Sequence, residues 1–289
     1  MNNNDFSITL IISTYNWPEA LNVSLLSVTH QTYLPIEVIV ADDGSRDDTR
    51  ELIEEMQKSF PCKLIHVWHE DNGFRLSEIR NKAIMKASGD YIIQIDGDII
   101  LEKHFVEDHH SFAQKGCFTS GSRVKLSPKS SAEVLRNGTV DIPFSWSSFF
   151  QPNRLRSKFL QNYFRFRYKA DHPYFVRGCN AAFWKEDLLK VNGYNEDIIG
   201  WGYEDTEIAA RLTFAGIKRQ FLKMGAVEYH IDHPVNSRDK VNQNHKTFLE
   251  TINSEGAYCK NGLDKYKYIC LLYLIRNCFY MEMIPGAFL

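Results

Sequence analysis

Apolar positions in the first hundred residues alternate between two patterns. Nearly continuous apolar runs occupy residues 8–12, 37–41, 63–68 and 92–95. Between these runs, apolar side chains recur at intervals of three and four over residues 18–30, 45–56 and 77–87. The runs predict short buried strands, and the intervals predict amphipathic helices. Strands and helices that alternate with short connections predict a mostly parallel α/β sheet flanked by helices.

Beyond the first hundred residues, the alternation of strand and helix patterns is interrupted and then resumes. Residues 127–173 are rich in Pro, Ser and Asn, and residues 154–169 are dense in basic and aromatic side chains. We predict an insertion with helical content here. Its basic and aromatic stretch fits either contact with a membrane surface or anionic acceptor, or a solvated helix with an aromatic inner face. Further on, the pattern predicts a strand at 178–184, a helix at 205–215 and a strand at 218–222.

The C-terminal tail is apolar but carries charges. Residues 265–283 are rich in Leu, Ile, Tyr and Cys and are interrupted by Lys267 and Arg276. A packed amphipathic helix and peripheral membrane contact both fit this pattern. No apolar run reaches the roughly 20 residues of a spanning helix, and the first residues do not resemble a secretory leader. We therefore predict a cytoplasmic protein, with membrane association and self-association left open.

Charge and cysteine content narrow the class of protein further. The 34 basic and 36 acidic residues give a net charge of −2, which provides no polycationic stripe for nucleic acid. The six cysteines are scattered without CxxC spacing, which is typical of reduced thiols rather than a disulfide framework.

Two acids follow the fourth predicted strand directly. Asp96 and Asp98 are separated only by Gly97. At the carboxyl ends of strands in an open α/β sheet, side chains face the crevice where ligands bind, so this pair can hold a hard divalent cation. An Asp-Gly turn between two strands is the alternative interpretation.

Five short motifs occur in a fixed order along the chain. They are ISTYN at residues 12–16, VADDGS at 40–45, IRN at 79–81, DGD at 96–98 and GWGYED at 200–205. Together the first four resemble the nucleotide-sugar-binding half of glycosyltransferase family 2, whose members adopt the GT-A fold. The fifth is similar to the WGxED segment of galactosyltransferase-type C-terminal regions and of bacterial chondroitin polymerases. The resemblance covers about residues 6–125 and 175–235.

The resemblance implies a GT-A fold in one continuous domain with a tail. We expect a nucleotide-sugar half at residues 1–125 and an acceptor-side half at 126–235, which contains the insertion at 127–173. A helical C-terminal extension should follow at 236–289.

The resemblance also assigns residues to the nucleotide. In the family, the second Asp of the DDGS segment reads the base, which implies Asp43 here with Asp42 in support. A guanidinium near phosphate oxygens can pair with them in bidentate fashion, which favours Arg80 and, less directly, Arg75. The full set of expected nucleotide contacts is Ser13, Thr14, Tyr15, Asp42, Asp43, Arg75, Arg80, Asn81, Asp96 and Gly97.

The remaining assignments concern metal, base and sugar. Asp96 and Asp98 would hold Mn²⁺ or Mg²⁺ with His230, and His233 is the alternate imidazole; a nitrogen ligand favours Mn²⁺. Asp205 is the expected catalytic base, and Glu204 would bind sugar hydroxyls. The expected sugar or acceptor contacts are Gly178, Asn180, Trp201, Gly202 and His233.

These assignments predict a metal-dependent inverting glycosyltransferase. It would move a hexose or N-acetylhexosamine from a UDP-sugar to a saccharide or lipid-linked saccharide, in the synthesis of a bacterial surface polysaccharide. The alternatives are a catalytically inactive carbohydrate-binding module of the same fold and a sugar nucleotidyltransferase. Sugar nucleotidyltransferases usually carry a Gly-rich basic loop after the first strand. This chain has ISTYN at the end of the first predicted strand instead.

Overall fold

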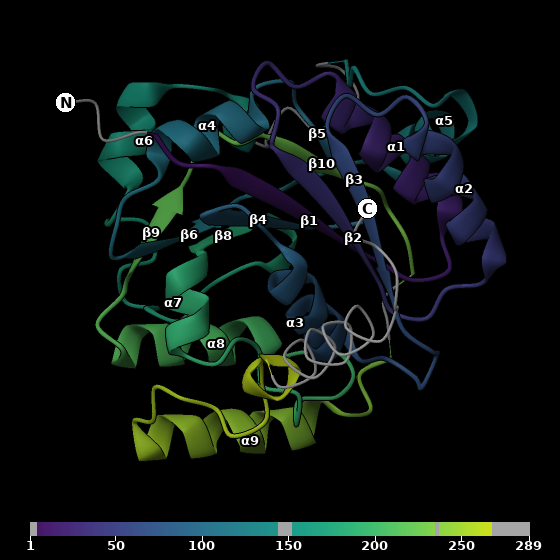
Figure 1. Cartoon of the computed structure of the whole chain (residues 1–289). Helices are drawn as coiled ribbons and strands as arrows, with labels where there is room; N and C mark the ends of the chain where they lie inside the picture. The colour runs from purple at the N-terminus through teal and green to yellow at the C-terminus, as the bar shows by residue number, and fades with distance from the viewer. Residues whose placement is uncertain (1–4, 144–151, 235–236, 268–289) are drawn as a thin grey trace, which may run out of the picture.

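The structure is a computed structural model that describes residues 5–143, 152–234 and 237–267. Within these residues, a seven-stranded sheet has the order β3-β2-β1-β4-β8-β6-β9, and a small sheet has the order β5-β10-β7 (Figure 1). The strands are β1 Ile8–Thr14, β2 Glu37–Asp42, β3 Lys63–Trp68, β4 Tyr91–Asp96, β5 Ile99–Leu101, β6 Cys117–Gly121, β7 Val124–Lys125, β8 Ala181–Trp184, β9 Lys218–Leu222 and β10 Glu228–His230. The helices are α1 Pro18–Thr29, α2 Asp47–Gln57, α3 Leu76–Lys86, α4 Phe105–Phe112, α5 Pro128–Asn137, α6 Lys158–Phe164, α7 Lys185–Lys190, α8 Glu204–Phe214 and α9 Val241–Ser254.

The four predicted strands of the first hundred residues form one parallel block. β1 pairs in parallel with β2 on one side and with β4 on the other, and β2 pairs in parallel with β3. The strand predicted at residues 63–68 matches β3 at both ends, and the other three lie within β1, β2 and β4. The prediction of a mostly parallel sheet flanked by helices is confirmed, because strands buried on both faces read as apolar runs.

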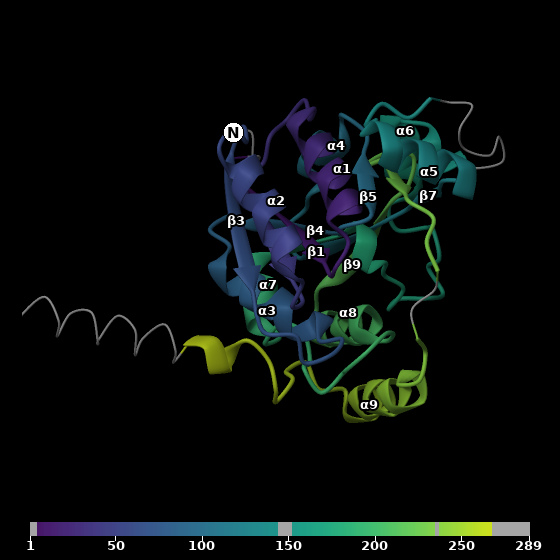
Figure 2. The same cartoon turned by 90° about the vertical axis from the view of Figure 1, so that its right-hand side faces the viewer.

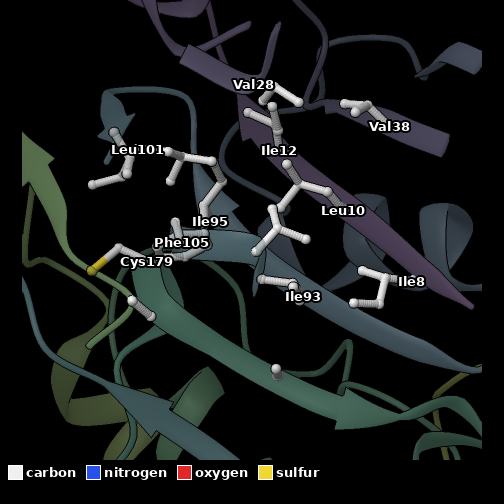
Figure 3. Packing of buried hydrophobic residues seen from close by; sticks show 14 of the residues in the cluster. Ile8, Leu10, Ile12, Val28, Val38, Ile93, Ile95, Leu101, Phe105 and Cys179 are labelled. Carbon is white, nitrogen blue, oxygen red and sulfur yellow. The ribbon is translucent and has the colours of Figure 1, made fainter. Parts of the chain in front are cut away.

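Alternate residues of β1 enter different cores. Ile8, Leu10 and Ile12 point to the side covered by α1, where Leu21 and other α1 residues complete the cluster (Figure 3). Ile11 faces the opposite side and packs with residues of α3 and α8. The two-residue period of a strand therefore anchors helices on both faces of the sheet.

The second half of the chain completes the same sheet. β8 lies between β4 and β6 and is antiparallel to both. The strand predicted at residues 178–184 is shorter than expected, because Gly178–Asn180 forms a 3₁₀ turn and β8 begins at Ala181. The helix predicted at 205–215 and the strand predicted at 218–222 correspond to α8 and β9.

The described part of the insertion contains helices joined by turns and loops. α5 and α6 lie in it, and α6 presents Phe159 and Tyr163 to solvent while Gln161 is buried. The alternative of an aromatic inner face is therefore wrong for these two rings.

Beyond residue 236, α9 packs on α8, where the Thr251 hydroxyl donates to the Glu207 carboxylate at 3.0 Å. The tail predicted at 265–283 lies almost wholly outside the described residues. Among those described, no helix combines the length and apolarity that crossing a membrane requires. The division at residues 125 and 235 stays a prediction.

Candidate active site

Polar side chains gather where the parallel strands end. Ser13 of β1 is in register with Asp96 of β4, and Thr14 is in register with Asp42 of β2. Parallel strands bring their carboxyl ends to one edge, so motifs about 30 and 80 residues apart in sequence become neighbours there. The amide of Gly97 donates to the Ser13 carbonyl at 2.7 Å. A Cβ on Gly97 would approach Ser13 and Thr14 to about 3.1 Å, which explains the glycine between the two acids.

Two carboxylates after β2 are each paired with a histidine. Asp42 accepts from the Ser45 amide at 2.8 Å and contacts His66 Nε2 at 2.9 Å. Asp43 contacts His69 Nε2 at 2.7 Å and accepts from the Arg75 amide at 2.9 Å. We call Asp42, Asp43, His66 and His69 the Asp43 group. The sequence motifs did not include either histidine, although the predicted parallel strand at 63–68 ends at this same edge.

A lysine sets the tautomer of His69. Lys82 Nζ lies 3.0 Å from His69 Nδ1 and 2.8 Å from the Glu78 carboxylate. An ammonium can only donate, so Nδ1 of His69 accepts and Nε2 carries the proton. His69 therefore donates to Asp43, and each oxygen of Asp43 has a donor within the protein.

Two aromatic rings are exposed beside the Asp43 group. Tyr15 is 47% exposed and donates its hydroxyl to Asp71 at 2.9 Å, and this hydrogen bond raises the pKa of Tyr15. Trp68 is 52% exposed, and its indole N–H donates to the Ser45 carbonyl at 3.1 Å. Large rings that are held by their polar ends while their faces remain open can stack on a planar ligand.

Arg80 connects the two halves of the site. Its side chain is 1% exposed; Nε donates to Ser13 Oγ at 3.3 Å, Nη1 to Asp205 at 3.0 Å and Nη2 to Asp96 at 3.1 Å. We call these four residues the Arg80 cluster. The guanidinium is buried and holds two carboxylates, and its expected contact with a phosphate stays a prediction. Burial alone would lower the pKa of Arg80, but Asp205 and Asp96 raise it above its usual value.

The acids around Arg80 are crowded. Burial, followed by the neighbouring Asp205, raises the pKa of Glu204 to about 7. Burial also raises the pKa of Asp96 to about 6; Arg80 opposes this, and Asp98 adds to it. Such perturbed carboxyl groups are typical of functional sites.

The backbone near the start of α8 accommodates the side chains of Glu204 and Asp205. Glu204 accepts from the Gly202 amide at 3.0 Å, and Gly202 has φ +104°. A Cβ on Gly178 would lie 2.3 Å from Asp205 Oδ2, so only glycine leaves room for this carboxylate. Gly178 thus serves the site by its lack of a side chain.

Asp98 lies beside both candidate histidines. His233 Nε2 is 2.9 Å and His230 Nε2 is 3.5 Å from Asp98 Oδ2, and one ligand atom from each of the three residues falls within 4.8 Å of the others. β10 is antiparallel to β5 and pairs His230 with Ile99, which brings the imidazole next to Asp98. We call Asp98, His230 and His233 the Asp98 group. Asp96 was expected here, but it is outside this group, and its Oδ1 accepts from Arg80.

The Asp98 group has capacity for a ligand. Asp98 Oδ1 is buried and has no hydrogen-bond partner among the described residues. Burial lowers the pKa of His230, whereas the hydrogen bond to Asp98 raises the pKa of His233. One carboxylate and two imidazoles form a donor set that suits a borderline divalent ion such as Mn²⁺ better than Mg²⁺.

Two expected contact residues serve the fold. Asn81 is fully buried; its amide donates to the Tyr194 carbonyl and the Glu196 carboxylate, each at 2.8 Å, and accepts from the Tyr194 amide. Asn180 is also fully buried, donates to two backbone carbonyls and pairs with His109. These contacts give both side chains a role within the fold, and their assignment to nucleotide and to sugar stays a prediction.

The segment before α8 remains accessible. Trp201 is partly exposed, and the Arg238 guanidinium lies 5.0 Å from its ring centroid. Asn244 of α9 donates to the carbonyls of Ile199 and Gly202, each at 3.0 Å. The C-terminal extension thus supports the loop that carries Trp201.

Solved structures share this architecture. A mannosyltransferase from Pyrobaculum calidifontis, in complex with GDP-Man and Mn²⁺, matches with TM-score 0.55 and 19% identity over 84% of this chain and 62% of that chain. TarS 1–349 of S. aureus, in complex with UDP, matches with TM-score 0.58 and 18% identity over 86% of this chain and 65% of that chain. The fold is therefore of the GT-A type.

The chain belongs to glycosyltransferase family 2, whose model matches residues 9–190. A second model, described as the N-terminal domain of galactosyltransferase, matches residues 158–234. Among curated proteins, the chain is 24% identical to a chondroitin synthase and 28% identical to a hyaluronan synthase, both of Pasteurella multocida, over 80% and 78% of its length. It spans about a quarter of the length of each, 25%.

Proposed function

We propose that this chain is a metal-dependent inverting glycosyltransferase that moves a hexose or N-acetylhexosamine from a UDP-sugar to an acceptor hydroxyl. One observation supports this most strongly: the Arg80 cluster joins Asp205 of α8 to Asp96, two residues before Asp98. The acid proposed to take a proton thus shares a polar cluster with Asp96, which is separated only by Gly97 from Asp98 of the proposed metal site.

The Asp98 group is the proposed metal site. Asp98, His230 and His233 would hold Mn²⁺, and Oδ1 of Asp98, which has no hydrogen-bond partner among the described residues, is available as a further ligand atom. A bound divalent cation would stabilise the charge that develops on a departing nucleoside diphosphate. The solved neighbours include a mannosyltransferase complexed with GDP-Man and Mn²⁺, which supports this proposal.

The Asp43 group is the proposed base-binding site. A uracil offers an N3–H donor between two carbonyls, and the buried carboxylate of Asp43 can accept from it. His69 and the Arg75 amide hold that carboxylate in one orientation. Exposed Tyr15 and Trp68 can pack on the nucleoside, and TarS complexes with UDP and with UDP-GlcNAc support a UDP-linked donor.

Asp205 is the proposed catalytic base. The acceptor hydroxyl must lose a proton as it attacks the anomeric carbon, and a carboxylate on the face opposite the leaving diphosphate produces inversion. Arg80 holds Asp205 in place by pairing with Oδ1, while Oδ2 lies beside Gly178. Glu204, at the first turn of α8, can accept hydrogen bonds from sugar hydroxyls, and Trp201 with Gly202 can cover the sugar.

The curated relatives suggest the biological setting. Proteins named chondroitin synthase and hyaluronan synthase support a role in bacterial polysaccharide synthesis, with a saccharide or lipid-linked saccharide as acceptor.

The test is a panel of sugar nucleotides with the full chain and Mn²⁺. We expect UDP release with one UDP-sugar and an oligosaccharide acceptor, loss of release after chelation, and product with inverted anomeric configuration by NMR. UDP that neither binds nor is released under any of these conditions would refute the proposal.

A further inference from the structure

Helix α6 exposes two of its aromatic side chains to solvent. Phe159 is 78% exposed, whereas Gln161, two residues further on, is 4% exposed. The Gln161 amide donates to the Met224 carbonyl at 3.0 Å, so this polar residue anchors the inner face. A surface helix normally turns its apolar stripe to the core. In α6, Leu160 and Phe164 are half-buried, but the rings of Phe159 and Tyr163 lie on the solvent side.

The exposed apolar residues continue beyond the helix. Leu155 is 51%, Tyr163 50% and Phe166 47% exposed. Phe159 and Tyr163 are four residues apart and share one face of α6, whereas Leu155 precedes the helix and Phe166 follows it. We call these four residues, with Lys158 and Arg167, the outer α6 patch.

The patch and its surroundings are basic, although Asp108 and Glu107 pair with one of the cations, Arg156. Residues 152–170 contain six Lys and Arg residues and no Asp or Glu. Lys158 and Arg167 are exposed, and the Arg167 guanidinium lies 4.9 Å from the Tyr163 ring centroid. Nearby, Lys169 has its pKa lowered by burial and by the positive charges of Arg177 and Arg219. Apolar and cationic groups therefore share one surface.

We propose that the outer α6 patch docks on an anionic phospholipid membrane. The headgroup region of a bilayer accepts aromatic and aliphatic side chains at its acyl boundary and attracts Lys and Arg to its charged lipids. A second copy of the chain fits the patch poorly, because symmetric pairing would bring the two basic segments together. A soluble anionic polysaccharide would neutralise the charges and could stack on the rings, but it offers no apolar interior to the exposed aliphatic side chain of Leu155.

The membrane would hold one end of the molecule. α6 lies at the top and α9 at the bottom in both perpendicular views (Figures 1 and 2). Docking through the patch therefore leaves α9 and the adjoining α8 turned away from the bilayer.

The test measures binding of the full chain to vesicles. We expect co-sedimentation with vesicles of 30% phosphatidylglycerol in phosphatidylcholine, little binding to pure phosphatidylcholine, and release as ionic strength rises. Phe159→Ser with Tyr163→Ser should lower the partition coefficient about tenfold or more, and Lys158→Glu with Arg167→Glu should remove the preference for anionic vesicles.

A matched control lies on α9. Lys246 and Leu249 are an exposed cation and an exposed apolar residue on that helix, and Lys246→Glu with Leu249→Ser should leave binding unchanged. Hydrogen exchange provides the local readout: anionic vesicles should slow exchange in residues 155–170. The proposal is overturned if wild type ignores anionic vesicles, if the patch variants bind like wild type, or if residues 155–170 gain no protection.

Discussion

The Asp43 group and the Asp98 group contain the same residue types but are built for opposite purposes. In the first, each oxygen of Asp43 has a donor, and His69 is fixed by Lys82. In the second, Asp98 Oδ1 has no hydrogen-bond partner in the described chain, and two imidazoles lie near its other oxygen. A carboxylate with its donors in place suits recognition of one further N–H group. A carboxylate oxygen without a hydrogen-bond donor can instead coordinate a cation.

Asp98→Ala should have the largest effect. Removing the carboxylate leaves two imidazoles, so Mn²⁺ affinity should fall by more than the roughly 10–100-fold that loss of an outer-shell partner costs. UDP release should become undetectable. Titration of the protein with Mn²⁺, followed by electron paramagnetic resonance, measures the loss directly.

The matched control for this change is Asp43→Asn. It should leave Mn²⁺ binding in the absence of nucleotide within about twofold, because the Asp43 group has no place for the ion. Equal loss of Mn²⁺ in both variants would erase the distinction between the two groups.

Asp205→Asn should separate chemistry from binding. The amide cannot accept the acceptor's proton, so kcat should fall about 10²–10⁴-fold. Binding of UDP with Mn²⁺ should change little, because neither the Asp43 group nor the Asp98 group contains Asp205. Steady-state kinetics with calorimetry of UDP binding would show this split, and an Asn variant with the wild-type kcat would exclude Asp205 as the base.

His69→Ala should weaken the nucleotide and spare the metal. Asp43 would lose a charge-assisted hydrogen bond, and UDP affinity should fall about tenfold. The affinity for uridine alone should fall by a similar factor, because Asp43 is proposed to contact the base and not the diphosphate. His230→Ala should show the reverse, with weaker Mn²⁺ binding and unchanged affinity for uridine. If His69→Ala left uridine affinity intact, its hydrogen bond to Asp43 would have no part in recognition.

Glu204→Gln should have the smallest effect, on the pH dependence of stability. The folded-state pKa of Glu204 is raised from 4.5 to about 7, so the folded protein holds this proton more tightly than the unfolded chain. Its favourable contribution is complete below pH 4.5 and is lost as pH rises through 7. The free energy of unfolding of wild type, relative to Glu204→Gln, should therefore fall by up to about 3 kcal/mol across this range. Urea unfolding at several pH values measures it, and parallel curves for the two proteins would contradict the shift.

Much of the architecture was predictable because it is encoded locally. Apolar runs and three-to-four spacing identified the parallel strands and their helices, and motif order indicated that Asp42, Asp96 and Ser13 would share one edge. The predictions from sequence were incomplete where the role of a side chain depends on contacts with residues far away in the sequence. Arg80 and Asn81 are adjacent in sequence, yet one holds the carboxylates of the site and the other fastens the Tyr194 backbone.

The sequence by itself determined the sheet, the family and the acids at the strand ends, because hydrophobic periodicity and strand termini are short-range properties. Only the tertiary structure decided which side chains meet. β10 pairs with β5 across more than a hundred residues and brings two histidines to Asp98, while Arg80 turns inward to Asp96 and Asp205. It also turned Phe159 of α6 outward, because Gln161 has a backbone partner inside and the ring does not.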